Sequence, residues 1–504
     1  MNFRTVERPN VFGKCRVIRF GTSGWRGIIA EDFTFAGVRA AARAIADHLL
    51  GLGAGGRGSD TLNREPGTEN REPAVAVGYD TRFLSEAFAT ECVKILAAAG
   101  IRSHLVERPT PTPVLAHAVR TLGAAGGINI TASHNPPEWN GLKFSGASGG
   151  PALPEVTDAI AERANTILAA PDAAVPALAL ADARARGLVV PLDPAPAYAA
   201  QVRRVVEFAT IHLAGLRVAV DLLHGTAGGY LDALLREAGC EVEVLHAERN
   251  PGFGGHPPEP SAARLQALGT RVRQGGHHLG LACDGDADRF GVLDADGTFV
   301  EPNAILALIA AHLLKARDWP GGLARSVATT HLLDRVAARH GRPLYETPVG
   351  FKYIAELIEK DAIVLGGEES AGMSVRGHVP EKDGILACLL VTELVAAQGR
   401  LPLRRLLEAL QAELGPVLTR RINVPLGYGG PEVLEARLQD LPSRVGGRAV
   451  VGVNRTDGVK LLLEDGSWLL VRPSGTEPMA RLYLEAASEA ALDGLESAGR
   501  SLLP

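Results

Sequence analysis

Three successive stretches of this chain repeat one pattern, in which strand and helix signals alternate and the last strand leads into a polar motif. The first stretch begins with the apolar run 75–80, continues through the helical pattern 85–99 and reaches the strand 127–130. The second begins at 217–221 and the third at 327–330. Alternating strands and helices predict parallel sheets covered by helices on both faces. Ligands of such sheets bind beyond the carboxyl ends of the strands, where all three polar motifs fall.

The motif after the second stretch carries the most charge, because Asp284, Asp286 and Asp288 stand at every second position and Arg289 follows them. In an extended loop, side chains two apart share a face, so the three carboxylates converge. Their repulsion requires a cation, and few oxygen ligands with room for phosphate favour Mg²⁺. The alternative is a solvated turn, but apolar runs on both sides indicate the mouth of a buried strand. The motif therefore predicts a magnesium site used in phosphate chemistry.

The motif after the first stretch, TASHNPP at 131–137, contains Ser133. A serine behind a buried strand is most often a cap or a turn residue. Here Asn135 and the two prolines stiffen the loop, while His134 and Lys143 supply groups that handle protons or bind phosphate. This loop is therefore a second candidate for phosphate chemistry.

Two further loops offer phosphate ligands. The segment 21–27 reads GTSGWRG, whose glycines permit close backbone approach and whose Arg26 suits bidentate phosphate binding. The segment 472–478 reads RPSGTEP and offers a guanidinium, two hydroxyls and free backbone N–H groups, the components of an anion nest. An ordinary hairpin turn is the alternative for this second segment.

From about residue 418 the pattern changes to short alternating runs joined by turn signals such as Asp457-Gly458, which favour antiparallel hairpins. The fold class that we predict is α/β, with three related domains of mixed or parallel sheets and a smaller C-terminal α+β domain around a central cleft. The predicted domains are 1–194, 195–300, 301–416 and 417–504.

Two segments interrupt this pattern. Residues 169–196 are rich in alanine and proline, so we expect no regular structure there and a domain linker near their end. Residues 51–73 are polar and rich in glycine, which predicts a surface insertion.

Composition excludes several classes of partner. The net charge of −5 comes from interspersed charges in 504 residues, so nothing indicates binding to nucleic acid or to a membrane surface. The five cysteines lie far apart without a Cys-x-x-Cys pair, which fits reduced thiols in the cytoplasm. We find no signal peptide and no apolar run long enough to span a bilayer. We expect a cytoplasmic protein that is a monomer or a homodimer.

The loops form a recognisable set. In chain order, GTSGWRG, TASHNPPEWNGLK, DGDADR, GGEESAG and RPSGTEP resemble the signature loops of the α-D-phosphohexomutase superfamily, above all those of bacterial phosphoglucomutases. The resemblance covers essentially the whole chain, and the superfamily is built of three related α/β domains and a smaller fourth one. It implies hexose phosphates as substrates, Mg²⁺ as cofactor and glucose 1,6-bisphosphate as activator.

The resemblance also implies a role for each loop. Ser133 would carry a phosphoryl group, and Mg²⁺ would be held by Asp284, Asp286, Asp288 and an oxygen of that phosphoserine. Arg26, His134 and Lys143 would lie near the transferring phosphate, with Lys143 carrying a proton if its pKa is lowered. Arg289 would contact the phosphoserine. Sugar hydroxyls would meet Glu368 and Ser370, and a second phosphate would bind Arg472, Ser474, Gly475 and Thr476.

The choice of sugar depends on the third motif. Gly372 stands where phosphomannomutases usually carry a histidine, so glucose is the first choice, mannose the second and glucosamine the third. His378 or Lys382 would then replace the missing proton carrier. A non-catalytic protein that binds sugar phosphates and a phosphatase are the alternatives from other classes. Four domains around one cleft also predict that the last domain moves when substrate binds.

Overall fold

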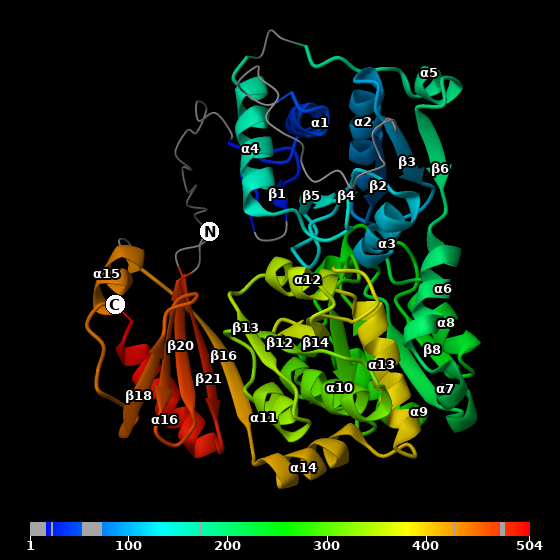
Figure 1. Ribbon diagram of the computed structural model, residues 1–504. Coiled ribbons are helices and arrows are strands. Elements are labelled where there is room, and N and C mark those ends of the chain that lie inside the picture. Colours follow the sequence, from blue (N-terminus) through cyan, green and yellow to red (C-terminus); the bar gives the residue numbers. More distant parts are fainter. Residues whose placement is uncertain are drawn as a thin grey trace, which may run out of the picture.

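The computed structural model describes residues 17–21, 24–52, 73–170, 174–427, 430–473 and 479–503, which form four sheets (Figure 1). Most of the 51–73 insertion lies outside the described residues. Within the described part of the chain, no helix has both the length and the apolar character needed to cross a bilayer.

The first domain is a six-stranded mixed sheet in the order β1-β5-β4-β2-β3-β6 with helices around it. Its strands are β1 Trp25–Ile28, β2 Ala74–Tyr79, β3 Arg102–Val106, β4 Gly126–Ile130, β5 Trp139–Gly146 and β6 Val189–Leu192. Its helices are α1 Phe35–Leu49, α2 Ser85–Ala98, α3 Thr112–Leu122, α4 Pro154–Leu168 and α5 Leu180–Ala185.

The expectation of no regular structure in 169–196 is wrong, because α5 and β6 lie there. Strand β6 pairs in parallel with β3 alone and ends the sheet, with Pro191 opposite Leu105. An edge strand tolerates a proline because one side of it donates no hydrogen bonds to a neighbour.

The second domain has the strand order β11-β10-β9-β7-β8. Its strands are β7 Arg217–Asp221, β8 Glu241–Leu245, β9 Leu279–Cys283, β10 Phe290–Leu293 and β11 Phe299–Val300. Its helices are α6 Ala195–Val205, α7 Phe208–Ala214, α8 Leu231–Glu237, the 3-10 turn η1 Phe253–Gly255 and α9 Gln266–Gly275. Strands β7, β8 and β9 are parallel, whereas β9 and β10 form an antiparallel pair.

The third domain has the strand order β13-β12-β14-β15. Its strands are β12 Gly322–Ser326, β13 Leu344–Thr347, β14 Ile363–Glu368 and β15 Gly372–Val375. Its helices are α10 Pro302–Ala316, α11 Leu332–Arg339, α12 Phe351–Glu359, α13 Gly384–Ala397 and α14 Leu403–Leu414. The strand expected at 327–330 is wrong in position, because the strand occupies 322–326. It contains Arg325, a buried charge that Asp334 and Glu346 neutralise, and such a residue breaks the apolar pattern of a strand.

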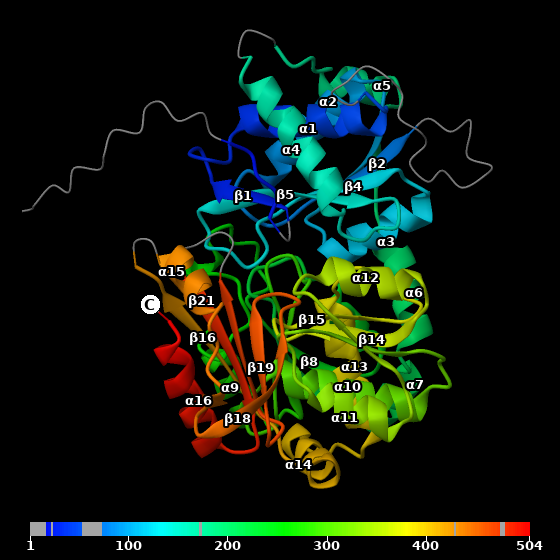
Figure 2. The same ribbon diagram turned by 60° about the vertical axis from the view of Figure 1, so that its left-hand side comes forward.

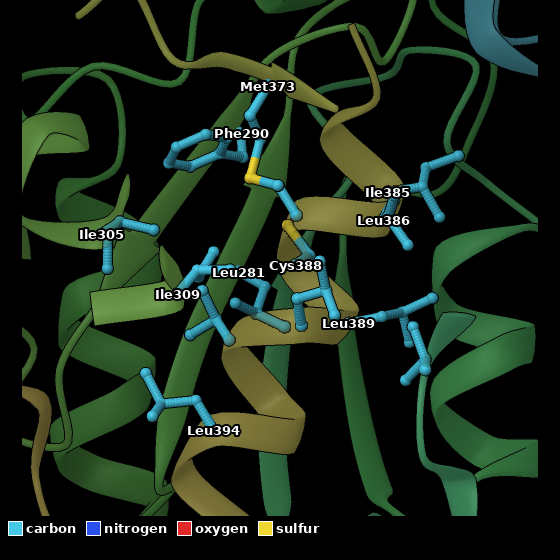
Figure 3. Close-up of a cluster of buried hydrophobic side chains, with 14 of the residues drawn as sticks. Leu281, Phe290, Ile305, Ile309, Met373, Ile385, Leu386, Cys388, Leu389 and Leu394 are labelled. Carbon is cyan, nitrogen blue, oxygen red and sulfur yellow. The ribbon is translucent and has the colours of Figure 1, made fainter. Parts of the chain in front are cut away.

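The second and third domains share one apolar core. Helix α13 is buried from Gly384 to Val395 and packs between β9, β10 and β15. Figure 3 shows Leu281 of β9, Ile309 of α10 and Met373 of β15 gathered around Cys388 and Leu389 of α13. A helix that is apolar on every side is buried on every side, which explains this position.

The fourth domain is a six-stranded antiparallel sheet in the order β16-β21-β20-β19-β18-β17. Its strands are β16 Leu418–Pro425, β17 Arg444–Val445, β18 Arg448–Asn454, β19 Val459–Leu463, β20 Trp468–Pro473 and β21 Met479–Ala486, and its helices are α15 Gly430–Arg437 and α16 Glu489–Ser501. The hairpin predicted from Asp457-Gly458 is confirmed, and a second hairpin turns at Asp465-Gly466. One face packs on α16 and the other turns toward the third domain, as Figure 2 shows. The predicted architecture of three α/β domains and one α+β domain is confirmed.

Candidate active site

The first and second domains meet where the loop after β4 faces the loop between β9 and β10. Ser133 Oγ donates a hydrogen bond of 2.7 Å to Asp284 Oδ2 across this boundary. Both side chains are buried. The approach requires Gly285, because a Cβ at that position would stand 2.7 Å from the carbonyl oxygen of Ser133. Two motifs that lie 151 residues apart in the chain thus share one site.

Asp284, Asp286 and Asp288 bring one carboxylate oxygen each to within 4.8 Å of the others. The expectation of an extended loop is wrong. Residues 284–289 turn back to join β9 and β10, and Ala287 adopts a left-handed φ of 58°. The carboxylates therefore converge because the backbone turns, not because alternate side chains of a strand share a face.

These three carboxylates fit a hard divalent cation. Asp286 Oδ1 and Asp288 Oδ1 are buried and accept no hydrogen bond from any described residue. Burial, together with the charges of Asp288 and Asp286, raises the pKa of Asp284 well above its ordinary value. An ion such as Mg²⁺ binds oxygen ligands, so it would give these two carboxylate oxygens a partner and would offset the repulsion among the three carboxylates.

Two lysines also reach these carboxylates. Lys143 Nζ lies 2.6 Å from Asp286 Oδ2 and 2.9 Å from Asp288 Oδ2. Lys382 Nζ lies 3.3 Å from Asp288 Oδ2 and 3.0 Å from Glu381 Oε1. Burial lowers the pKa of Lys143, but the two aspartates outweigh burial and the net shift is upward. The proton-carrier role expected of Lys143 would need a lowered pKa, whereas the charges of the two aspartates shift its pKa upward.

Position 372 and Lys382 depend on each other. A Cβ at Gly372 would stand 2.4 Å from Lys382 Cδ, so a side chain at 372 excludes the path that Lys382 takes. His378, the other expected replacement, has a fully buried side chain whose Nε2 lies 2.7 Å from Asp383 Oδ2. His378 is thus enclosed in the protein, whereas Lys382 reaches the carboxylates.

Three more of the expected residues surround the serine loop. Arg26 Nη1 donates to Asn135 Oδ1, which ties β1 to the loop. His134 Nδ1 lies 3.8 Å from Glu259 Oε1, and burial followed by the charge of Arg289 lowers the pKa of His134 well below its ordinary value. The backbone N–H of Arg289 donates to Asp284 Oδ1 at 3.0 Å, while its Nε is buried without an acceptor among the described residues. Arg289 therefore has a donor left for an anion.

The third motif lies at the end of β14, which extends to Glu368. Glu368 Oε1 accepts a hydrogen bond of 2.8 Å from the N–H of Gly350. Burial, followed by the charge of Glu369, raises the pKa of Glu368 to about 7. Ser370 and Arg289 line a cavity of about 300 Å³ between the second, third and fourth domains.

The fourth domain contributes arginines from neighbouring strands. Arg472 Nε donates to Asp457 Oδ1 at 2.8 Å, and Arg481 stands directly opposite Arg472 in the β20–β21 pair. The Nε of Arg481 is buried without an acceptor among the described residues. The expected ligands Ser474, Gly475 and Thr476 lie outside the described residues.

Sequence reasoning missed three residues of this site, namely Arg481, Thr112 and Arg82. Thr112 begins α3, and its Oγ1 donates to Asp286 Oδ2 at 2.5 Å while its N–H donates to the Asp286 carbonyl at 2.9 Å. A serine or threonine at a helix start is ordinarily a cap, so this threonine gave no signal of its own. Arg481 had a signal, because it lies close behind the RPSGTEP loop on a strand pattern.

Known protein families match the chain in four separate segments, which correspond to its four domains. The descriptions "Phosphoglucomutase/phosphomannomutase, alpha/beta/alpha domain I", domain II and domain III match residues 17–170, 196–297 and 301–414. The description of the C-terminal domain of the same family matches residues 422–499. The four matches together cover most of the chain.

Individual relatives carry three different sugar names. The "Probable phosphoglucosamine mutase" of Methanopyrus kandleri is 34% identical over 475 residues, which span 93% of this chain and 94% of that protein. A phosphoglucomutase of Komagataeibacter xylinus is 30% identical over 530 residues, spanning 96% and 90%. A solved structure from Thermus thermophilus, named "putative phosphomannomutase", has a TM-score of 0.79 and 34% identity, covering 96% of this chain and 98% of that one.

Proposed function

Because the chain belongs to the phosphoglucomutase/phosphomannomutase family, whose members are intramolecular phosphotransferases, we propose that it interconverts glucose 1-phosphate and glucose 6-phosphate. The reaction would proceed through a phosphoryl group on Ser133 and a glucose 1,6-bisphosphate intermediate, which would also prime the enzyme. The observation that carries the proposal is the contact of Ser133 Oγ with Asp284 at the junction of two domains.

The residues around Ser133 divide the work of phosphoryl transfer. Mg²⁺, held by Asp284, Asp286, Asp288 and the serine oxygen, would neutralise charge on the transferring group. Lys143 would hold the phosphoryl group by its fixed charge, and Arg26 and Arg289 would direct guanidinium donors toward it. His134, neutral because of its lowered pKa, would act only as an acceptor or a neutral donor in the same loop.

The sugar would lie between the serine loop and the fourth domain. Glu368 and Ser370 would bind its hydroxyls, and Arg472 with Arg481 and the loop 474–476 would bind the distal phosphate. Burial lowers the pKa of Lys382, but the charges of Asp288 and Glu381 outweigh burial and raise it. Lys382 would therefore stabilise the oxygen of the reacting hydroxyl by its positive charge beside Gly372. The bisphosphate must turn over between the two transfers, which is why the cleft needs two phosphate sites.

Glucose is proposed as the substrate because Gly372 stands where phosphomannomutases usually carry a histidine. Glucosamine phosphate is the second candidate, because the relative from Methanopyrus kandleri carries that name at 34% identity. Mannose phosphate follows from the name of the Thermus thermophilus structure. For the cellular site we propose the cytoplasm, because the four described cysteines are free thiols.

The deciding experiment compares the wild type with Ser133→Ala, using Ser501→Ala as the control at an exposed serine. Mass spectrometry measures phosphate on Ser133 after incubation with Mg²⁺ and glucose 1,6-bisphosphate, and a coupled assay measures kcat/KM for the three hexose 1-phosphates. We expect phosphate and turnover in the wild type and the control but not in Ser133→Ala. Sustained turnover by Ser133→Ala would refute the phosphoserine mechanism, and release of inorganic phosphate without isomerised sugar would indicate a phosphatase.

A further inference from the structure

Arg82 lies beneath the serine loop and takes no part in the function proposed above. It follows β2, and its side chain is fully buried. Its two terminal nitrogens donate to four backbone carbonyls of the loop. Nη2 donates to Ser133 O at 2.6 Å and Asn135 O at 2.6 Å, and Nη1 donates to Pro136 O at 2.7 Å and Trp139 O at 3.0 Å.

These carbonyls would not converge without a cation. Carbonyl oxygens carry partial negative charge, and four of them around one point repel one another unless donors fill the space between them. Ser133 also has a left-handed φ of 52°, which is strained for a residue with a side chain. A planar guanidinium supplies several donors in fixed directions, whereas an ammonium supplies a point charge.

The direction of the Ser133 carbonyl determines where the N–H of His134 points, because both belong to one planar peptide group. The described chain has no cis peptide bond, so the N–H of His134 points opposite to the Ser133 carbonyl that Arg82 binds. This N–H has no acceptor among the described residues. A free backbone donor therefore stands next to the oxygen that would carry the phosphoryl group.

Arg82 and its neighbours also contact both the first and the second domain. Asp80 Oδ2 lies 3.1 Å from Arg82 Nε and balances its charge, and Asp80 Oδ1 accepts from Ser85 Oγ at 2.7 Å. The guanidinium lies over the ring of Phe253 in the second domain, 4.9 Å from the ring centre. Thr81 Oγ1 donates to the carbonyl of His224, also in the second domain, at 2.8 Å. Residues 80–82 thus hold the serine loop in a fixed position relative to the aspartate loop.

We propose that Arg82 is a positioning residue for phosphoryl transfer. By binding the four carbonyls it holds Ser133 Oγ against Asp284 and presents the N–H of His134 to the phosphoryl group on Ser133. This inference rests on the proposed function, because it assumes that Ser133 is phosphorylated.

The test uses Arg82→Lys, which keeps the charge but loses the fork of donors, and Arg82→Ala, with Arg317→Lys as the control. Arg317 is a mostly buried arginine that binds Glu393 and a backbone carbonyl far from the serine loop along the chain. We expect kcat of Arg82→Lys to fall about 100-fold, since misplacement by about 1 Å costs that much, with KM changed less than about twofold. The ³¹P resonance of phosphoserine 133 should shift, and added guanidinium should partly restore kcat in Arg82→Ala.

A fold defect alone would lower kcat with KM unchanged, because it reduces the fraction of active enzyme, but it would not shift the ³¹P resonance of the folded fraction and added guanidinium would not raise activity. Wild-type kcat and ³¹P shift in Arg82→Lys would overturn the inference while the proposed function stands. Wild-type protein that accepts no phosphate on Ser133 would overturn both. If the Arg82 variants do not fold, the amide resonance of His134 in the wild type decides: it should move downfield on phosphorylation, and an unmoved resonance would overturn the inference.

Discussion

Lys460 of β19 is a charged side chain buried between the third and fourth domains. Its Nζ donates to the carbonyl of Val327 at 2.8 Å and lies 2.7 Å from His331 Nε2, both in the third domain. It also stands 3.9 Å above the ring centre of Trp468. Burial, followed by the charge of Arg325, lowers its pKa from 10.5 to about 7, although Glu346 and Glu485 raise it.

This lowered pKa makes the docking of the two domains depend on pH. Between pH 7 and pH 10.5 the unfolded chain binds a proton at Lys460 that the folded chain has lost, so stability rises with pH in that window. The slope approaches about 1.4 kcal/mol per pH unit, which gives about 1 kcal/mol between pH 7.5 and 8.5. For a unit the size of the fourth domain, this corresponds to roughly 4–8 °C in Tm.

The perturbation is Lys460→Met, which keeps an unbranched side chain one atom shorter and removes the titrating group. Differential scanning fluorimetry at pH 7.5 and 8.5 measures the change in Tm for the wild type, Lys460→Met and the exposed control Lys315→Met. Only the difference between the two pH values is compared, because loss of the bond to Val327 also lowers the stability of the variant at both. The wild type and the control should gain stability with pH and Lys460→Met should not. An equal gain in Lys460→Met would refute the reasoning.

Three further predictions follow from the site. Gly372→Ala should lower kcat at least about tenfold, because its Cβ would stand 2.4 Å from Lys382 Cδ, whereas Gly494→Ala, which meets no atom within 4 Å, should leave kcat unchanged in the same coupled assay. As pH falls through about 7, Glu368 takes up a proton and loses its charge, so kcat/KM should fall below pH 7 in the wild type, and a pH profile of Glu368→Gln should lack that step. Chelation of Mg²⁺ by EDTA should stop turnover and lower Tm, by the equivalent of about 2.7 kcal/mol when the ion had been present at about 100 times its Kd; an unchanged Tm would contradict the metal site.

Elements with a regular pattern could be predicted from the sequence, and elements that depend on a tertiary partner could not. Strand β7 and helix α2 follow their apolar spacing, and the hairpins of the fourth domain follow their Asp-Gly turns. Strand β12 was misplaced because Arg325 interrupts its apolar run, and only the folded chain supplies Asp334 and Glu346 to neutralise it. Strand β6 was missed because a proline inside a strand is acceptable only at an edge, and edge position is a property of the whole sheet.

Among the site residues, too, some could be predicted from a sequence pattern and others depend on tertiary contacts. Ser133 and the aspartates carry reactive groups in unusual runs, so their motifs could be found without knowing the fold. Arg82 acts through backbone carbonyls that lie 51 to 57 residues away in the chain, and no spacing in the sequence reports such contacts. Lys382 was one of two alternatives until the structure placed its stem over Gly372 and enclosed His378.

The charges at the site also bear on whether a metal ion and a phosphoryl group would bind together. When all three are ionised, Asp284, Asp286 and Asp288 bring three negative charges, and Lys143 and Lys382 offset two of them. A phosphoryl group on Ser133 would add about two negative charges beside Asp284, whose Oδ2 lies 2.7 Å from the serine oxygen. Without a divalent cation, this repulsion in a buried site would exceed what the lysines neutralise. Phosphorylated Ser133 and Mg²⁺ should therefore stabilise each other, since the two added charges cancel, and this is why removal of the metal is expected to stop turnover rather than merely slow it.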